Sequence, residues 1–139
     1  MSTFDAMPKA PEPDMNQPIS FLETGPNRAE RCAVIHESEN GLEILHVYGE
    51  ADLTAVGEFE TALESAAASG RPVVIDLGPC QYLDSTMLSA FVKANQTYLG
   101  RFWIVVPQTG IVRRLFTITS LIVHLPIVDS LAAAGLHAL

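Results

Sequence analysis

The chain of 139 residues has few cysteines, few basic residues and no long apolar run. Its two cysteines, Cys32 and Cys80, form no CxxC pair, which argues against a disulfide framework or structural zinc and for ordinary thiols. Eight basic against sixteen acidic residues give a net charge of −8, which argues against direct binding of nucleic acid or anionic lipid. No stretch approaches the roughly 18 apolar residues of a membrane-spanning helix, and the N-terminus lacks a signal-peptide pattern. We therefore expect no membrane insertion and a cytoplasmic location.

Motifs of the common enzyme classes are also missing from the sequence. Ser85 lacks the flanking glycines of a nucleophile elbow, and neither a P-loop nor a GxGxxG motif occurs. Asp76 and Asp84 are the only acid–base pair to consider, but Asp76 lies inside an apolar run, which favours structural roles for both. Metal-ligand spacing is absent from all four histidines: His36, His46, His124 and His137. We expect no enzyme, no metal and no cofactor.

What the sequence does contain is one apolar-rich segment behind a proline-rich leader. Residues 1–30 hold five of the nine prolines, and we expect them to form a flexible leader. The remaining residues, 31–139, form the predicted domain, and a hydrophobic fraction of 48% is enough to bury a core. Residues 31–69 carry eight acids and one base, whereas residues 70–139 carry three acids and five bases. The domain is therefore expected to present surfaces of different sign.

Apolar patterns and turn signals predict alternating strands and helices. They indicate a β-hairpin over 32–52 with its turn at 38–41, a helix over 54–69 capped by Thr54, a buried strand over 72–77 and a connecting loop over 78–83. They then indicate a helix over 84–100, a strand over 102–106, a helix from about 109, a strand over 122–128 and a terminal helix. The expected architecture is α/β, a small mixed and mainly parallel sheet of about five strands with about four helices.

The helix expected from about residue 109 carries the main basic feature of the second half. Its spacing places Ile111, Leu115 and Ile118 inward. The pair Arg113 and Arg114 then points toward solvent. Because these arginines lie opposite an acidic first half, they are candidate contacts for a partner.

The segment with the most functional information is Asp84-Ser85-Thr86, at a predicted loop-to-helix junction. An oxygen at this position can accept the free amide hydrogens of the first helical turn as an N-cap. A hydroxyl there can also accept a phosphate, because a helix N-terminus favours a negative charge. The two roles are compatible, and both stay open at this point.

Four stretches in order carry a resemblance to a known family. They are residues 45–52 (LHVYGEAD), 74–77 (VIDL), 83–86 (LDST), and 115–121 with 125–131 (LFTITSL and LPIVDSL). On these stretches, over about residues 32–136, the chain resembles the STAS domain and, within it, the stand-alone bacterial anti-sigma factor antagonists. The resemblance implies a STAS-like fold with an N-terminal β-hairpin.

The resemblance also implies a binding switch. In the family, the unphosphorylated antagonist binds an anti-sigma factor that is also an ATP-dependent serine kinase, and phosphorylation of the Asp-Ser-Ser/Thr motif breaks that complex. Carried onto this chain, the phosphoacceptor is Ser85, with Thr86 as the adjacent alternative and Asp84 beside them in the partner-binding surface. The family usually continues with Gly-Leu-Gly, whereas this chain has Met87 and Ser89 at the glycine positions. These two side chains obstruct a kinase that approaches closely, or Met87 supplies an apolar contact to a divergent partner. In the third alternative, Met87 is a partly exposed methionine with no role.

Two alternatives remain beside the switch. The first is a STAS scaffold that is not phosphorylated, or a subunit of a larger assembly such as a stressosome-like complex or a lipid transporter's cytoplasmic partner. The second is a small enzyme or nucleotide-binding protein that uses Asp76 and Asp84. A homodimer is compatible with all of these readings.

Overall fold

The structure, a computed structural model, describes residues 32–138, so the predicted leader over residues 1–30 lies outside the described residues. The strands are β1 (Cys32–Glu39), β2 (Leu42–Ala51), β3 (Val73–Asp76), β4 (Cys80–Leu83), β5 (Phe102–Val105) and β6 (Ile127–Val128). The helices are α2 (Val56–Ala67), α3 (Ser85–Thr97), α4 (Ile111–Ile118) and α5 (Leu131–Ala138), with short 3-10 turns η1 (Leu53–Ala55) and η2 (Leu121–Val123).

The six strands form one mixed sheet in the order β1-β2-β3-β5-β6, and β4 pairs with β2 beyond the end of β3. Only β1 runs antiparallel to its neighbour, and all other pairs are parallel. The hairpin between β1 and β2 turns at Asn40 and Gly41, whose φ values of 54° and 80° suit a two-residue turn of the hairpin type. The expected α/β architecture and its N-terminal hairpin are confirmed.

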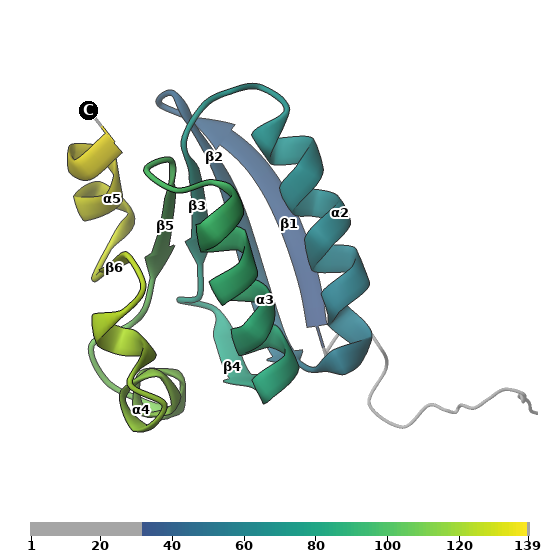
Figure 1. Ribbon diagram of the computed structural model, residues 1–139, viewed down its shortest axis with the longest axis vertical. Coiled ribbons are helices and arrows are strands. Elements are labelled where there is room, and N and C mark those ends of the chain that lie inside the picture. The colour runs from purple at the N-terminus through teal and green to yellow at the C-terminus, as the bar shows by residue number, and fades with distance from the viewer. Residues whose placement is uncertain (1–31, 139) are drawn as a thin grey trace, which may run out of the picture. The chain divides into compact units, whose positions relative to one another are not determined.

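Helices cover both faces of the sheet (Figure 1). One face packs against α2, α3 and α4, where Phe59, Phe91 and Phe116 form a continuous aromatic row. The Phe59 and Phe91 ring centroids lie 5.2 Å apart, and those of Phe91 and Phe116 lie 6.3 Å apart. The other face packs against α5 through a smaller cluster that includes Ala134. The larger core therefore holds α3 against α2 and α4.

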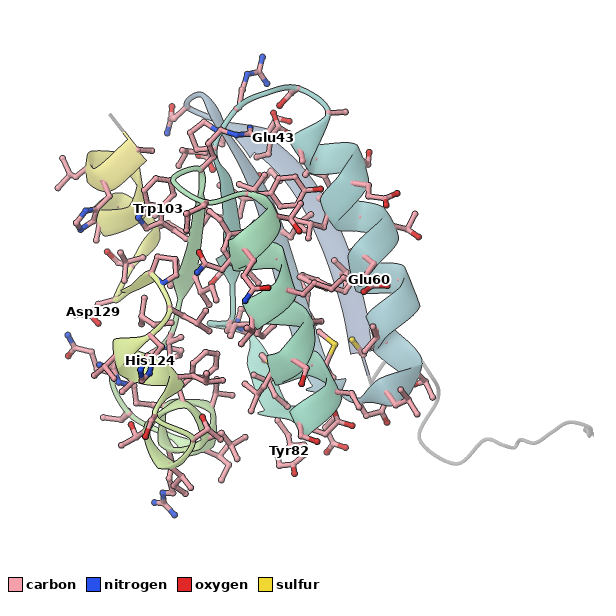
Figure 2. The ribbon with its side chains drawn as sticks, viewed as in Figure 1. Glu43, Glu60, Tyr82, Trp103, His124 and Asp129 are labelled. Carbon is pink, nitrogen blue, oxygen red and sulfur yellow. The ribbon has the colours of Figure 1, made fainter. Side chains whose placement is uncertain are left out.

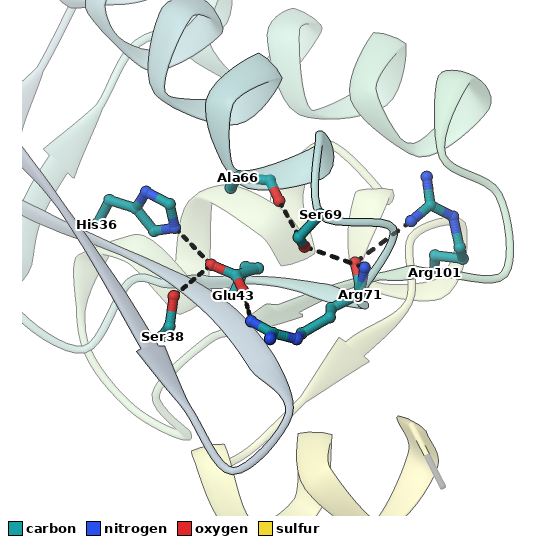
Figure 3. A network of polar contacts seen from close by, with 7 residues as sticks. All are labelled: His36, Ser38, Glu43, Ala66, Ser69, Arg71 and Arg101. Carbon is teal, nitrogen blue, oxygen red and sulfur yellow. Dashed lines mark hydrogen bonds and ion pairs between the residues drawn. The ribbon is translucent and has the colours of Figure 1, made fainter.

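Glu43, in β2, is the one buried charged residue among the described residues (Figure 3). Its Oε1 atom accepts from Ser38 Oγ at 2.6 Å and lies 2.7 Å from His36 Nε2, while its Oε2 atom accepts from Arg71 Nη1 at 2.6 Å. The hydrogen bonds from Ser38 and then His36 lower the pKa of Glu43 to about 2, and Arg71 adds to this effect against the cost of burial. This network joins the hairpin to the segment before β3.

Three expectations about local structure are wrong. The segment 78–83, expected as a loop, contains β4, whose residues Cys80 and Leu83 are buried while the two between them are exposed. Thr54 does not cap the first helix, because Asp52 caps the preceding turn η1 and accepts from both the Thr54 amide and the Thr54 hydroxyl. The last predicted strand is also shorter than expected, with η2 in place of its first part.

Candidate functional site at the N-terminal end of α3

Asp84 organises the junction between β4 and α3. It is the N-cap of α3, and its Oδ1 atom accepts from the amides of Thr86 at 3.0 Å and Met87 at 3.1 Å. Its Oδ2 atom accepts from the amide of Leu53 at 3.0 Å, 31 residues earlier in the chain. The Asp84 amide in turn donates to the Ala51 carbonyl at 3.1 Å. Through its backbone and its side chain, this one residue joins the end of β2, the turn η1 and the first turn of α3.

The same hydrogen bonds keep Asp84 ionised. Burial raises the pKa of this carboxyl, but the bonds from the Thr86 hydroxyl and from the Met87 and Leu53 amides outweigh burial and lower the pKa below its ordinary value. Both carboxylate oxygens already have partners inside the protein. Asp84 therefore has a positioning role, and as a partner contact it stays a prediction.

The two candidate hydroxyls differ in what they contact. Ser85 is the first residue of α3 and is exposed. Thr86 is half-buried, and its hydroxyl donates to Asp84 Oδ1 in a short hydrogen bond. Phosphate transfer requires an accessible hydroxyl that is free to lose its proton. Of the two, Ser85 has the better geometry for a phosphoacceptor.

The two residues that replace the family's usual glycines lie in different surroundings. Met87 has no exposed surface and belongs to the larger core, next to Leu88 and Phe91. The expectation of a partly exposed Met87 that contacts a partner or obstructs a kinase is therefore wrong, because α3 rotates this position onto its inner face. Ser89 is exposed and lies one turn after Ser85, on the same side of α3. Only Ser89 is available at the surface.

Two exposed apolar side chains lie on η1 and β4, the elements joined to the start of α3, and sequence reasoning missed them. Leu53 is 65% exposed and its backbone is bound to Asp84, while Tyr82 is 44% exposed in β4, three residues before Ser85. Figure 2 shows Tyr82 at the end of the molecule where α3 begins. Glu50, the register partner of Tyr82 in β2, is exposed and adds negative charge. We call Leu53, Tyr82, Ser85 and Ser89 the α3-start surface.

Helix α4 packs beside β4 at this same end of the sheet (Figure 1). Its inner face differs from the expectation by one position, because Val112 and Phe116 are buried while Ile111 and Ile118 are exposed. Leu115 is half-buried against the core, as the predicted face required.

The two arginines of α4 also differ from each other. Arg113 is half-buried, and its Nη1 atom lies 3.4 Å from Asp129 Oδ1 and donates to the Val106 carbonyl at 3.4 Å. Arg114 is exposed. Arg114 therefore presents its charge more freely than Arg113, and both remain predicted partner contacts.

The described residues offer little for metal or thiol chemistry. Among residues 32–138 there is no group of three or more His, Cys, Asp and Glu side chains placed to hold a metal ion. Cys32 and Cys80 are free thiols, and burial raises the pKa of Cys80 to about 11, so its thiol stays protonated. Within the same residues, no helix is both long enough and apolar enough to cross a bilayer.

With this geometry in view, comparison with known families is decisive. The STAS domain family matches residues 34–134. The chain belongs to the STAS domain family. The resemblance seen in the sequence is thus confirmed over nearly the same residues. No curated protein matches the sequence closely enough to count as a relative.

Solved structures share the STAS fold of this chain. An anti-sigma factor antagonist from Mycobacterium paratuberculosis superposes with a TM-score of 0.69 at 23% identity, covering 78% of this chain and 95% of that one. The anti-sigma factor antagonist SpoIIAA in its unphosphorylated form gives a TM-score of 0.54 at 15% identity, covering 75% and 94%. The Bacillus protein SpoIIAA in its phosphorylated form gives 0.53 at 14% identity, covering 75% and 96%. At identities of 14% to 23%, these similarities show that the chain shares the fold of these proteins and show the fold alone.

Proposed function

We propose that this STAS protein is an anti-sigma factor antagonist that works by partner switching. In its unphosphorylated form the α3-start surface binds an anti-sigma factor that is also a serine kinase, and phosphorylation of Ser85 ends that binding. The observation that carries the proposal is the exposed Ser85 hydroxyl at the start of α3, next to exposed Leu53 and Tyr82. Asp84 fixes this position from inside and leaves Ser85 itself outside.

Phosphorylation at Ser85 changes binding more than folding. A phosphoserine carries about −1.5 to −2 charges at neutral pH. The first turn of α3 tolerates that charge through its amide hydrogens and dipole. Against a partner, however, the phosphate has to lose water beside Leu53, Tyr82 and the ionised Asp84, and this opposes association.

The same surface favours binding over catalysis. Asp84 is saturated by internal hydrogen bonds, and Asp76 bonds to His46 and Gly78 elsewhere in the fold. Neither carboxylate is available as a general base. In this proposal the protein is the substrate of a kinase in the cytoplasm, and it acts by binding to that kinase.

The comparisons support the proposal at the level of the family. The named structural neighbours include anti-sigma factor antagonists, and one of them is recorded in both unphosphorylated and phosphorylated forms. The burial of Met87 supports it as well, because Met87 presents no side chain that a kinase would have to avoid. Of the two positions where the family usually has glycine, only Ser89 presents a side chain that a kinase would contact.

The test combines phosphorylation with binding. The full chain is incubated with candidate anti-sigma factor kinases and ATP, and any added phosphate is located by mass spectrometry. We expect phosphate on Ser85 in the wild type and in Thr86→Val, and none in Ser85→Ala. By calorimetry, Ser85→Ala retains binding to the kinase, whereas Ser85→Glu weakens it by about 100-fold, the order expected for an unpaired charge in an interface.

Each alternative gives a different result. Stable kinase binding without any phosphate would favour the scaffold reading. Phosphate on Thr86 with Ser85 unmodified would contradict the assignment of the acceptor. Heat released by nucleotide alone, without a kinase, would favour a nucleotide-binding protein.

A further inference from the structure

His46, in β2, bridges two carboxylates on the face of the sheet opposite α2 and α3. Its Nδ1 atom lies 2.7 Å from Asp76 Oδ2 in β3, and its Nε2 atom lies 2.7 Å from Glu37 Oε1 in β1. His46 and Asp76 are direct register partners, and Glu37 lies two residues along β1 from the partner of His46. The cluster therefore spans three adjacent strands.

The geometry around His46 favours its protonated form. Both ring nitrogens face a carboxylate oxygen at 2.7 Å, and a carboxylate accepts hydrogen bonds without donating them. A neutral imidazole has only one N–H group, so it satisfies one of these contacts and turns a lone pair toward the other. Only the imidazolium donates to Glu37 and Asp76 at once. The structure thus describes a bridge that exists with His46 charged.

The surroundings of His46 reinforce this state. Partial burial lowers its pKa, but the hydrogen bonds to Glu37 and Asp76 and the charges of these groups outweigh burial and raise the pKa above its ordinary value. From β1 the charged group facing His46 is Glu37, and from β3 it is Asp76. On its own strand the Tyr48 ring lies 6.5 Å away between centroids. The His46 side chain is only 15% exposed.

Asp76 carries the bridge into the turn between β3 and β4. Its second oxygen, Oδ1, accepts from the Gly78 amide at 2.9 Å. The turn packs so closely on this carboxylate that a Cβ atom on Gly78 would lie 3.0 Å from Asp76 Oδ1. Among the strands, β4 pairs with β2 alone over three register pairs, so this turn helps to hold β4 in place beside the packing of α4. Strand β4 then ends at Leu83, directly before Asp84 and Ser85.

We propose that protonated His46 is a positioning residue that braces the β3–β4 turn through Asp76 and thereby holds β4 and the start of α3 in place. The significance of holding Ser85 in place rests on the proposed function. The effect of His46 on the β3–β4 turn does not. As pH rises through the titration of His46, the imidazolium loses its proton to solvent. The neutral ring has one N–H group for two carboxylates, and a bond from it to either one is no longer charge-assisted on the imidazole side, so the hold on Asp76 weakens and the turn loosens.

The brace is tested on the full chain without any kinase. The protonation of His46 is followed by the ¹⁵N shifts of its ring nitrogens, and amide hydrogen exchange is measured across the same pH range and corrected for the intrinsic rate. We expect the amides of residues 78–83 to exchange on the order of tenfold faster once His46 is neutral, since a charge-assisted hydrogen bond is lost. Amides of α2, which lies on the other face of the sheet from His46, serve as the internal reference.

Variants separate the brace from a general loss of stability. Glu37→Gln removes the more exposed carboxylate, so the pH at which His46 titrates and the turn loosens should shift downward together. Glu39→Gln, the same change two residues along β1 at an exposed position, should shift neither. His46→Gln should give fast exchange of residues 78–83 at every pH, with α2 unchanged.

Two results would overturn the brace. One is an exchange rate at residues 78–83 that does not change as His46 titrates in the wild type. The other is a shift of the titration in Glu37→Gln that leaves the turn unaffected. Neither depends on whether Ser85 accepts phosphate, so a failed phosphorylation assay and a failed brace are told apart.

Discussion

The two ends of the sheet each contain a carboxylate with several hydrogen bonds, but the partners of the two carboxylates differ in kind. At the end where the parallel strands begin, Glu43 is buried and bound by the side chains of Ser38, His36 and Arg71. At the end where the strands finish, Asp84 is bound mainly by backbone amides. The first arrangement closes its end of the domain with side chains. The second leaves side chains free at the surface.

This difference indicates which end is suited to a partner. Side chains that bind Glu43 are unavailable for any other contact, whereas amides bound to Asp84 leave Ser85, Leu53 and Tyr82 facing outward. In open α/β sheets, ligands generally bind beyond the carboxyl ends of the strands. The α3-start surface, which we propose as the partner-binding surface, lies at that end of the sheet. Substitutions at Glu43 and at Asp84 test this difference at one end of the sheet at a time.

The largest effect is expected from Glu43→Ala. The substitution removes the acceptor for three side chains and leaves space under α2, so we expect a loss of about 3 kcal/mol in the free energy of unfolding. Urea unfolding at neutral pH measures the loss, with Glu39→Ala as the matched control at an exposed position of the same hairpin. The control should stay within about 0.5 kcal/mol of wild type. Equal losses in both variants would mean that Glu43 contributes no more than a surface residue.

A smaller loss is expected from Asp84→Ala at the other end. The Thr86, Met87 and Leu53 amides lose their acceptor, which costs about 2 kcal/mol, at the upper end for an N-cap. The variant also frees the Thr86 hydroxyl, so phosphate should spread from Ser85 to Thr86 in the kinase assay. Asp52→Ala removes the cap of η1 and serves as the control. Retention of Ser85 selectivity in Asp84→Ala would contradict the positioning role of Asp84.

A pH series tests the contribution of the Glu43 carboxylate to stability separately from that of Asp84. The pKa of Glu43 is lowered to about 2, so its stabilising effect is complete above the ordinary value of 4.5 and is lost as pH falls through about 2. Between pH 5 and pH 2, wild type should therefore lose more unfolding free energy than Glu43→Gln. The effect is smaller than that of Glu43→Ala, because a protonated Glu43 still fills its site. Parallel curves for the two proteins would show that Glu43 does not titrate with folding.

Much of this fold could be predicted from local patterns, and its errors have physical causes. Asn40 and Gly41 mark the hairpin, and continuous apolar runs mark β3 and β5 because both faces of the sheet are covered. Strand β4 escaped prediction because only the first and last of its four residues are buried. The inner face of α4 was assigned one position early, since an eight-residue helix offers too few turns to separate the choices Ile111 and Val112.

The site was predictable only in part for a similar reason. The motif identified Asp84, Ser85 and Thr86, but the contact that distinguishes the two hydroxyls is a tertiary one. The half-buried position of Thr86 and the bond from Leu53 to Asp84 depend on how η1 lies against α3, 31 residues apart. Spacing alone likewise could not decide that Met87 turns into the core. The sequence gives the residue types of Leu53 and Tyr82, but nothing in it indicates that their side chains are exposed.

The smallest expected effect is the most specific for the α3-start surface. Leu53→Ala removes a side chain that is 65% exposed, so the free energy of unfolding should change by no more than about 0.5 kcal/mol. Kinase binding should nevertheless weaken by about tenfold, because an apolar contact at an interface centre is lost. Leu99→Ala is the matched control, since Leu99 is 75% exposed and follows the opposite end of α3. Calorimetry with the phosphorylating kinase compares the two, and equal weakening by both would mean that partner binding is not confined to the end of the sheet where Asp84 leaves its neighbours exposed.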